Sequence, residues 1–312
     1  MRYKPVRFIP DNTKYPFMRW SRFGFFLSGI LCAASIIIFA TVGLRYGIDF
    51  KGGSVITIRT QQPAELDKLR AELSALNLGA VELQQYGSPN DVLIRLEAQS
   101  GGEAAEQSAQ KLVKEALGPT VEIRSTETVG AKVSEELTQQ ATGAVMLSIF
   151  FVLFYLWVRF EWQFAMGAVI SLLHDVVLSI GLFCIIRLEF NLTIIAAILT
   201  IIGYSLNDTV VVFDRIREFL RRYKSMGLAD LIDFSINSVL PRTMLTSLAT
   251  MMALLALYFF GGEVIRGFAF AMIWGVVVGT YSSIFIASPV MILLGTKRES
   301  VSADTKAKVT KR

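Results

Sequence analysis

Six long apolar stretches constrain this 312-residue chain more than any other feature of its sequence. A helix needs about 20 mostly apolar residues to cross roughly 30 Å of hydrocarbon. Stretches of that length run at about 23–44, 139–158, 164–186, 191–213, 243–261 and 266–294. Hydrophobic residues make up 53% of the chain and charged residues only 18%, which excludes an ordinary soluble protein. The first stretch is too long for the core of a signal peptide. We therefore predict an α-helical polytopic membrane protein with six transmembrane helices, the first of them a retained anchor.

The placement of the basic residues predicts the topology. Segments 1–22, 214–242 and 295–312 each carry six Lys or Arg residues. Such segments stay on the cytoplasmic side, and with six spans all three fall on one side of the membrane. We therefore expect both termini to be cytoplasmic and the segment 45–138, with 10 basic and 14 acidic residues, to be periplasmic. The net charge of +5 then reflects topology, so we expect no nucleic acid as a partner.

The segment 45–138 has the periodicity of a folded α+β domain. Strands are expected at 55–58, 81–86, 92–96 and 121–126, helices at 66–76 and 104–117, and a turn at 87–90. The order β-α-β-β-α-β is that of a ferredoxin-like sandwich, a fold that serves many functions. The expected organisation is a cytoplasmic tail at 1–22, a first helix at 23–44, the periplasmic domain at 45–138, helices two to six at 139–294 and a basic cytoplasmic tail at 295–312.

The sequence points away from catalysis and from bound metals. The single His lies outside the inserted domain, so that domain has no Ser–His or Cys–His pair for nucleophilic chemistry. Cys32 and Cys184 both lie in apolar stretches, where each behaves as a small hydrophobe. We expect no cofactor, no metal and no enzymatic activity, and a binding or mechanical role for the domain.

Ionisable residues at membrane depth are the candidate functional residues, because each costs at least about 2.5–3.5 kcal/mol to insert. Asp208 lies in the cytoplasmic third of the fourth stretch, and we expect it to carry protons with Arg242 as its cation; a structural ion pair or an interhelical hydrogen bond is the alternative. Asp175 and His174 lie midway through the third stretch, where they either take part in transport or, for the His, pack by hydrogen bonding. Supporting polar residues on the fourth stretch are Tyr204, Ser205, Asn207 and Thr209.

Two further patterns concern packing. The stretch from Asp214 to Glu218 is expected to be a solvated continuation of the fourth helix rather than a catalytic site. Small residues recur every four positions along the sixth stretch, at Gly267, Ala271, Gly275, Gly279 and Ser283. Such a stripe lets helices approach closely, either within the bundle or against a partner.

Four motifs carry a resemblance to a known family. They are Gly47-Ile48-Asp49-Phe50-Lys51-Gly52-Gly53-Ser54, Leu173-His174-Asp175, Gly203-Tyr204-Ser205-Leu206-Asn207-Asp208-Thr209 and the stretch from Asn237 to Ser247. Together they resemble the SecF family of Sec accessory subunits, in the resistance-nodulation-division superfamily. The resemblance implies a subunit of the bacterial inner membrane that, with SecD, uses the proton-motive force to assist protein export through SecYEG after the ATP-driven step. It also marks Asp208 and Arg242 as linked to transport.

The resemblance implies partners and leaves alternatives. The implied partners are SecD, the SecYEG channel and the exported unfolded polypeptide, with YajC and YidC as further candidates. One alternative is half of a proton-driven solute exporter of the same superfamily. Another is an intramembrane protease, but Gly203-Tyr204-Ser205-Leu206 has neither the GxGD nor the GxSG pattern. We expect protonation near Asp208 to shift helix packing, so that the periplasmic domain swings while it grips the emerging polypeptide.

Overall fold

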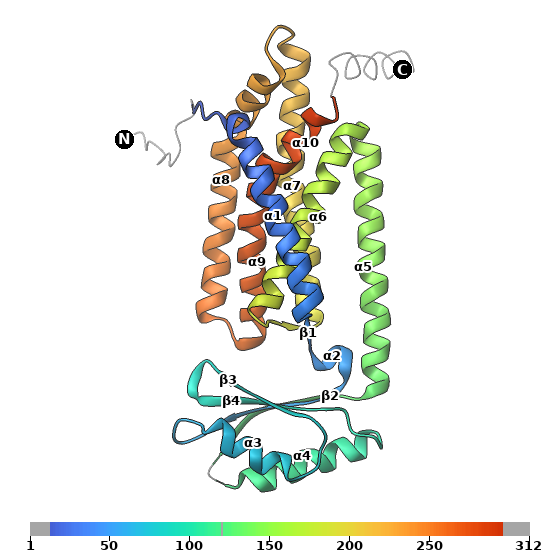
Figure 1. The fold of residues 1–312 in the computed structure, drawn as a ribbon, viewed down its shortest axis with the longest axis vertical. Coiled ribbons are helices and arrows are strands. Elements are labelled where there is room, and N and C mark those ends of the chain that lie inside the picture. Colours follow the sequence, from blue (N-terminus) through green and yellow to red (C-terminus); the bar gives the residue numbers. More distant parts are fainter. Residues whose placement is uncertain (1–12, 120, 296–312) are drawn as a thin grey trace, which may run out of the picture. The chain divides into compact units, whose positions relative to one another are not determined.

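The computed structural model describes residues 13–119 and 121–295, which form two compact units (Figure 1). The first, the membrane unit, holds the chain up to Leu44, Met146–Leu188 and the chain from Thr193 onward. The second, the inserted unit, holds Arg45–Val145 and Glu189–Leu192. Most of the predicted basic tails, at 1–12 and 296–312, lies outside the described residues.

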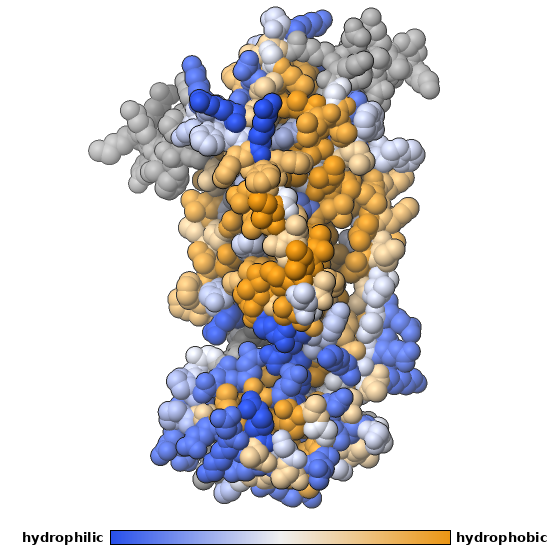
Figure 2. Space-filling view, viewed as in Figure 1, coloured by the Kyte–Doolittle hydropathy of each residue, from blue (hydrophilic) through white to orange (hydrophobic). Residues whose placement is uncertain are grey.

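Long apolar helices build the membrane unit. They are α1 (Phe17–Val42), α5 (Ala131–Arg159), α6 (Trp162–Ile185), α7 (Leu192–Arg222), α8 (Leu228–Phe260) and α9 (Glu263–Ser282), which continues into the π-helical η1 (Ser283–Ala287) and α10 (Ser288–Leu293). The membrane unit includes α5 from Met146 onward. Within the described part of the chain, six helices are long and apolar enough to cross a membrane, and apolar side chains cover much of the face seen in Figure 2. The predicted six-helix membrane fold is confirmed.

Most of these helices extend beyond the apolar stretches that predicted them: α1 and α5 begin six and eight residues earlier, and three further differences concern α7, α8 and α9. Helix α7 continues to Arg222, because Ile216, Phe219 and Leu220 recur at helical spacing beyond the apolar segment and pack into the core. Helix α8 begins at Leu228 and contains Pro241, so Arg242 lies well inside a helix and not at its start. The sixth predicted span is interrupted by η1 directly after Ser282. Such π-helical turns are rare and are often found at functional sites.

Four antiparallel strands and two helices form most of the inserted unit. The elements are β2 (Gly53–Arg59), α3 (Leu66–Ser74), β3 (Val81–Tyr86), β4 (Ser88–Leu96), α4 (Glu103–Leu117) and β5 (Glu122–Val129). The strand order β3-β4-β2-β5, with this chain order, is the ferredoxin-like arrangement. Ile56, Ile58 and Ile94 of the sheet are fully buried against Leu73 of α3 and Val113 of α4, so both helices share one face of the sheet.

Short elements connect this sheet to the rest of its unit. Strand β1 (Arg45–Tyr46) pairs in parallel with β6 (Glu189–Phe190), and α2 (Ile48–Lys51) follows β1. The Asp49 carboxylate accepts a hydrogen bond of 2.9 Å from the backbone N–H of Leu192. The chain on either side of α2 and the short segment between α6 and α7 are therefore held together.

The glycines of the first motif allow the backbone to pass close to the neighbouring strand β4. Gly53 has a φ of +108°, a region that side chains other than glycine rarely adopt. A Cβ atom at Gly53 would collide with the backbone carbonyl of Leu96 on the neighbouring strand β4. The Gly52-Gly53 pair is thus required by the entry of the chain into β2.

The turn between β3 and β4 is tighter than the sequence predicts. Strand β4 begins at Ser88, so only Gly87, with a φ of +71°, lies between the two strands. The Pro89 carbonyl accepts a hydrogen bond of 2.9 Å from the Ala64 N–H, and the Asn90 carbonyl accepts one of 2.8 Å from the Thr60 N–H. These backbone bonds hold residues 88–90 extended, where turn-forming residue types alone predict a loop.

Candidate functional site

A fully buried carboxylate, Asp175 of α6, is the centre of the polar site in the membrane unit. The Ser205 hydroxyl of α7 donates to its Oδ2 at 2.5 Å, and the Ser282 hydroxyl of α9 donates to the same oxygen at 2.8 Å. His174 Nδ1 lies 2.9 Å from the other oxygen, Oδ1. Side chains from α6, α7 and α9 therefore converge on one carboxylate.

These partners explain how an ionisable group can be buried at this position. An isolated carboxylate in an apolar interior is very costly, whereas each hydrogen bond to a charged group contributes about 1.5–3 kcal/mol. His174 is itself buried, and its Nε2 has no hydrogen-bond partner among the described residues. The His174 ring stacks on Tyr281 with 6.1 Å between ring centroids. The pair of His174 and Asp175 thus offers two atoms, a carboxylate oxygen and a ring nitrogen, that can each take a proton.

The second intramembrane carboxylate, Asp208 of α7, is also buried but is held more loosely. The Thr280 hydroxyl of α9 lies 3.5 Å from its Oδ2, which is at the outer limit for a hydrogen bond. Thr280 in turn lies 3.2 Å from the Ser247 hydroxyl of α8, and the Tyr204 hydroxyl is 3.5 Å from Ser247. A line of hydroxyl groups from α7, α8 and α9 thus leads to Asp208.

The two carboxylates belong to one polar layer. Ser205 and Asp208 are three residues apart on α7, and Thr280 and Ser282 are two residues apart on α9. Residues three apart lie on neighbouring positions of a helix surface. Helix α7 thus supplies Asp208 itself and, in Ser205, a donor to Asp175, and α9 supplies a hydroxyl near each carboxylate.

The structure does not pair Asp208 with Arg242. Arg242 is exposed on α8, and none of the ion pairs among the described residues joins it to Asp208. Asn207 is exposed as well, and Thr209 is buried with no partner for its hydroxyl among the described residues. The polar stripe expected on α7 therefore divides into residues that face the bundle and residues that do not.

The small-residue stripe of α9 faces α7. A Cβ atom at Gly279 would lie 2.9 Å from Cβ of Ser205, and one at Gly275 would collide with the side chain of Ile201. Further along, a Cβ atom at Gly267 would lie 3.9 Å from Ile194. The two remaining stripe residues, Ala271 and Ser283, are fully buried. This close approach of α9 to α7 is what allows Ser282 and Ser205 to reach the same oxygen of Asp175.

Sequence reasoning missed the partners that α9 supplies. Thr280, Tyr281 and Ser282 carry hydroxyl groups in a long apolar segment, and the hydroxyls of Thr280 and Ser282 bond to the two carboxylates. The Tyr281 hydroxyl donates to the Gly24 carbonyl of α1 at 2.9 Å and lies 3.0 Å from the Ser28 hydroxyl. With Ser283, four successive residues of this apolar span carry hydroxyl groups. Such a run is unusual, and this signal could have identified the site.

Two family descriptions match the sequence. “Protein export membrane protein SecD/SecF, C-terminal” matches residues 109–297, and “SecD/SecF GG Motif” matches residues 37–64. The second range contains the Gly52-Gly53 pair whose geometry is described above. The first contains both buried carboxylates.

Similar proteins extend over nearly the whole chain. The protein translocase subunit SecF of Rhodobacter capsulatus is 43% identical over 96% of this chain and 94% of its own length. The protein translocase subunit SecDF of Brucella abortus is also 43% identical over 96% of this chain, which spans 40% of that longer protein. The crystal structure of SecDF, a translocon-associated membrane protein from Thermus thermophilus, superimposes with a TM-score of 0.83 at 33% identity, over 93% of this chain and 40% of that one.

Proposed function

Because the chain belongs to the SecD/SecF family of protein export membrane proteins, we propose that it acts with SecD to couple proton movement across the membrane to the export of unfolded polypeptides. The expected resemblance is thereby confirmed, and membership in this family makes the chain a transport component and not an enzyme. The observation that carries the proposal is the buried Asp175, which is held by side chains from three helices.

The polar layer can convert a proton into a change of helix packing. While Asp175 is charged, Ser205 and Ser282 both donate to it and hold α7 and α9 together. A proton on the carboxylate removes the charge that strengthens these bonds, so α9 can shift against α7. One elementary charge that crosses 100 mV supplies about 2.3 kcal/mol, which can bias a two-state element tens-fold.

The path from this layer toward the first helix begins at Tyr281. Tyr281 stacks on His174 and bonds to the α1 backbone at Gly24, and η1 begins two residues later at Ser283. A shift of α9 would therefore move α1, the helix that precedes the inserted unit in the chain. This supports the proposal that the inserted unit swings during export while it grips the polypeptide.

Similar chains in other organisms guide the proposed partners. The longer SecDF of Brucella abortus contains a region similar to this chain, which supports SecD as the partner. The SecYEG channel, the emerging polypeptide, and YajC and YidC remain predictions. The same holds for the bacterial inner membrane as location and for cytoplasmic termini.

The experiment removes each carboxylate's charge without changing its shape. We propose Asp175→Asn and Asp208→Asn in cells that have no other copy of the subunit, and Asp230→Asn as a matched control, because Asp230 is exposed on α8. Proton-dependent export of a secreted precursor should fall at least about tenfold in both test variants, since one lost charge-assisted bond is worth about 1.5–3 kcal/mol. The control should export normally, and all three variants should co-purify with SecD.

The same experiment separates the two carboxylates and the cation. Normal export in Asp175→Asn would remove Asp175 from the mechanism and leave Asp208 as its carrier. Arg242→Gln tests the expected role of that cation, which the geometry leaves open. Normal export in Asp175→Asn and Asp208→Asn together would refute proton coupling through this layer.

A further inference from the structure

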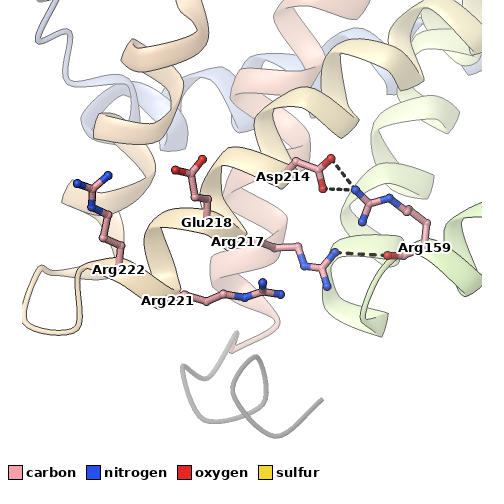
Figure 3. A pocket seen from close by; sticks show the side chains of 6 residues that line it. All are labelled: Arg159, Asp214, Arg217, Glu218, Arg221 and Arg222. Atoms are coloured by element: carbon pink, nitrogen blue, oxygen red, sulfur yellow. Dashed lines mark hydrogen bonds and ion pairs between the residues drawn. The ribbon is translucent and has the colours of Figure 1, made fainter. Parts of the chain in front are cut away.

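A basic pocket lies in the membrane unit where α5 ends and α7 extends beyond its apolar segment. It has a volume of about 550 Å³. The residues that line it are Arg159, Asp214, Arg217, Glu218, Arg221 and Arg222 (Figure 3). Figure 3 shows the side chains of Arg217 and Arg221 extending the same way from α7; the Arg159 backbone carbonyl faces Arg217, and the Arg159 side chain faces Asp214. No part of the proposed proton mechanism uses these residues.

Both acidic groups of the basic pocket are already neutralised. Arg159 Nη2 contacts both carboxylate oxygens of Asp214 at 2.6 Å, and Arg215 Nη1 lies 2.6 Å from Glu218. Arg217 donates only a long bond of 3.4 Å to a backbone carbonyl, and its Nε is buried without a partner in the described part of the chain. An excess of positive charge is therefore left at Arg217 and at Arg221, which is exposed.

Aromatic residues place the basic pocket at the level of the lipid headgroups. Trp157 and Trp162, on either side of Arg159, are 75% and 60% exposed, and exposed Trp residues gather at the membrane–water interface. Along α5 from Arg159, Phe150 and Phe154 are 60% and 50% exposed. An apolar surface thus leads away from the arginines, as a lipid acyl chain requires.

We infer that the basic pocket binds the phosphate of an anionic phospholipid headgroup, with an acyl chain lying along the exposed face of α5. Guanidinium groups bind phosphate through paired, charge-assisted hydrogen bonds, and basic pockets between transmembrane helices bind such headgroups. Arg217 and Arg221 contact the phosphate, and Arg159, held by Asp214, forms the wall toward α5. The inference is independent of the proposed function, since it concerns neither buried carboxylate.

The test measures lipid binding to the full-length protein. Detergent-solubilised protein is titrated with phosphatidylglycerol or phosphatidylcholine of identical acyl chains, and bound lipid is counted by native mass spectrometry. We expect wild type to prefer phosphatidylglycerol at least about fivefold, because each Arg near an anionic surface contributes about that factor. Arg221→Gln should lower the affinity about fivefold, and Arg217→Gln/Arg221→Gln should abolish the preference.

Two controls make the result decisive. Lys111→Gln/Lys114→Gln removes the same charge from exposed positions on α4 and should leave the preference unchanged. Glycerol phosphate alone should compete only weakly, since it lacks the acyl chains. Equal binding of both lipids by wild type, an unchanged preference in Arg221→Gln, or equally strong binding of glycerol phosphate would each overturn the assignment of a lipid site.

Discussion

The contact between α9 and α7 leads to a prediction in which packing controls the polar site. A Cβ atom at Gly279 would lie 2.9 Å from Cβ of Ser205, 3.2 Å from its Cα and 3.2 Å from its Oγ. Carbon atoms prefer a separation of about 3.5–4.0 Å, so Gly279→Ala must move Ser205 by roughly 0.5–1 Å. Its hydrogen bond to Asp175, now 2.5 Å long, would then lengthen beyond the usual range for a hydroxyl donor.

The energies predict a variant that folds but works poorly. Overpacking costs about 1–3 kcal/mol, and the better helix propensity of Ala returns about 1 kcal/mol. The net loss of stability should therefore be about 0–2 kcal/mol. The weakened bond to the charged carboxylate is worth about 1.5–3 kcal/mol, so proton-dependent export should fall roughly tenfold or more.

Thermal unfolding in detergent and an export assay separate these two effects. Gly203→Ala is the matched control on α7, because nothing lies within 4 Å of a Cβ atom there, and it should be slightly stabilised with normal export. Adding Ser205→Gly to Gly279→Ala removes the crowded atoms together with the hydroxyl. The double variant relieves the crowding but lacks the hydrogen bond to Asp175, so it should not regain export. If Gly279→Ala matches Gly203→Ala in both measurements, the close approach does not position the site.

Three further predictions concern local structure, each measured on the full-length protein. Gly53→Ala should destabilise the inserted unit by several kcal/mol, because Gly53 has a φ of +108° and the Leu96 carbonyl occupies the space that a Cβ atom would need. Faster amide exchange in β2 and β4 would show this loss, and unchanged exchange would contradict it. Arg59 donates from Nε and Nη2 to the two carboxylate oxygens of Asp91 at 2.6 Å and holds the pKa of Asp91 at about 2. The stability that Asp91 contributes should therefore be present above about pH 4 and be lost as the pH falls toward 2; circular dichroism melts at pH 6 and pH 3 should differ less in Asp91→Asn than in wild type. The Asp233 carboxylate accepts a hydrogen bond of 2.8 Å from the N–H of Met18 at the start of α1. Asp233→Ala should therefore lower the free energy of unfolding by about 1 kcal/mol and speed amide exchange at the first turn of α1. An unchanged exchange rate there would argue against this capping role.

The sequence alone determined the architecture and the family. Apolar length sets the number of membrane-spanning helices because hydrocarbon thickness is fixed, and the alternation of residues 45–138 predicted the ferredoxin-like domain through periods that depend only on local backbone geometry. Local signals were weaker at element ends. Residue types that favour a turn gave no hint of the backbone bonds that extend residues 88–90. The end of α7 and the start of α8 are amphipathic, with Ile216, Phe219, Leu231 and Ile232 in the core, so the length of continuous apolar sequence underestimates both helices.

Only the tertiary structure decided which polar residues meet. From the sequence, Asp208 and Arg242 were the expected pair, since they lie near the ends of successive helices. In the structure Arg242 is exposed, and Asp175 instead receives hydrogen bonds from α7 and α9. Such partners depend on helix rotation and on how closely α9 approaches α7 at Gly279. Those quantities arise from packing between segments more than seventy residues apart, and no local pattern in either helix encodes them.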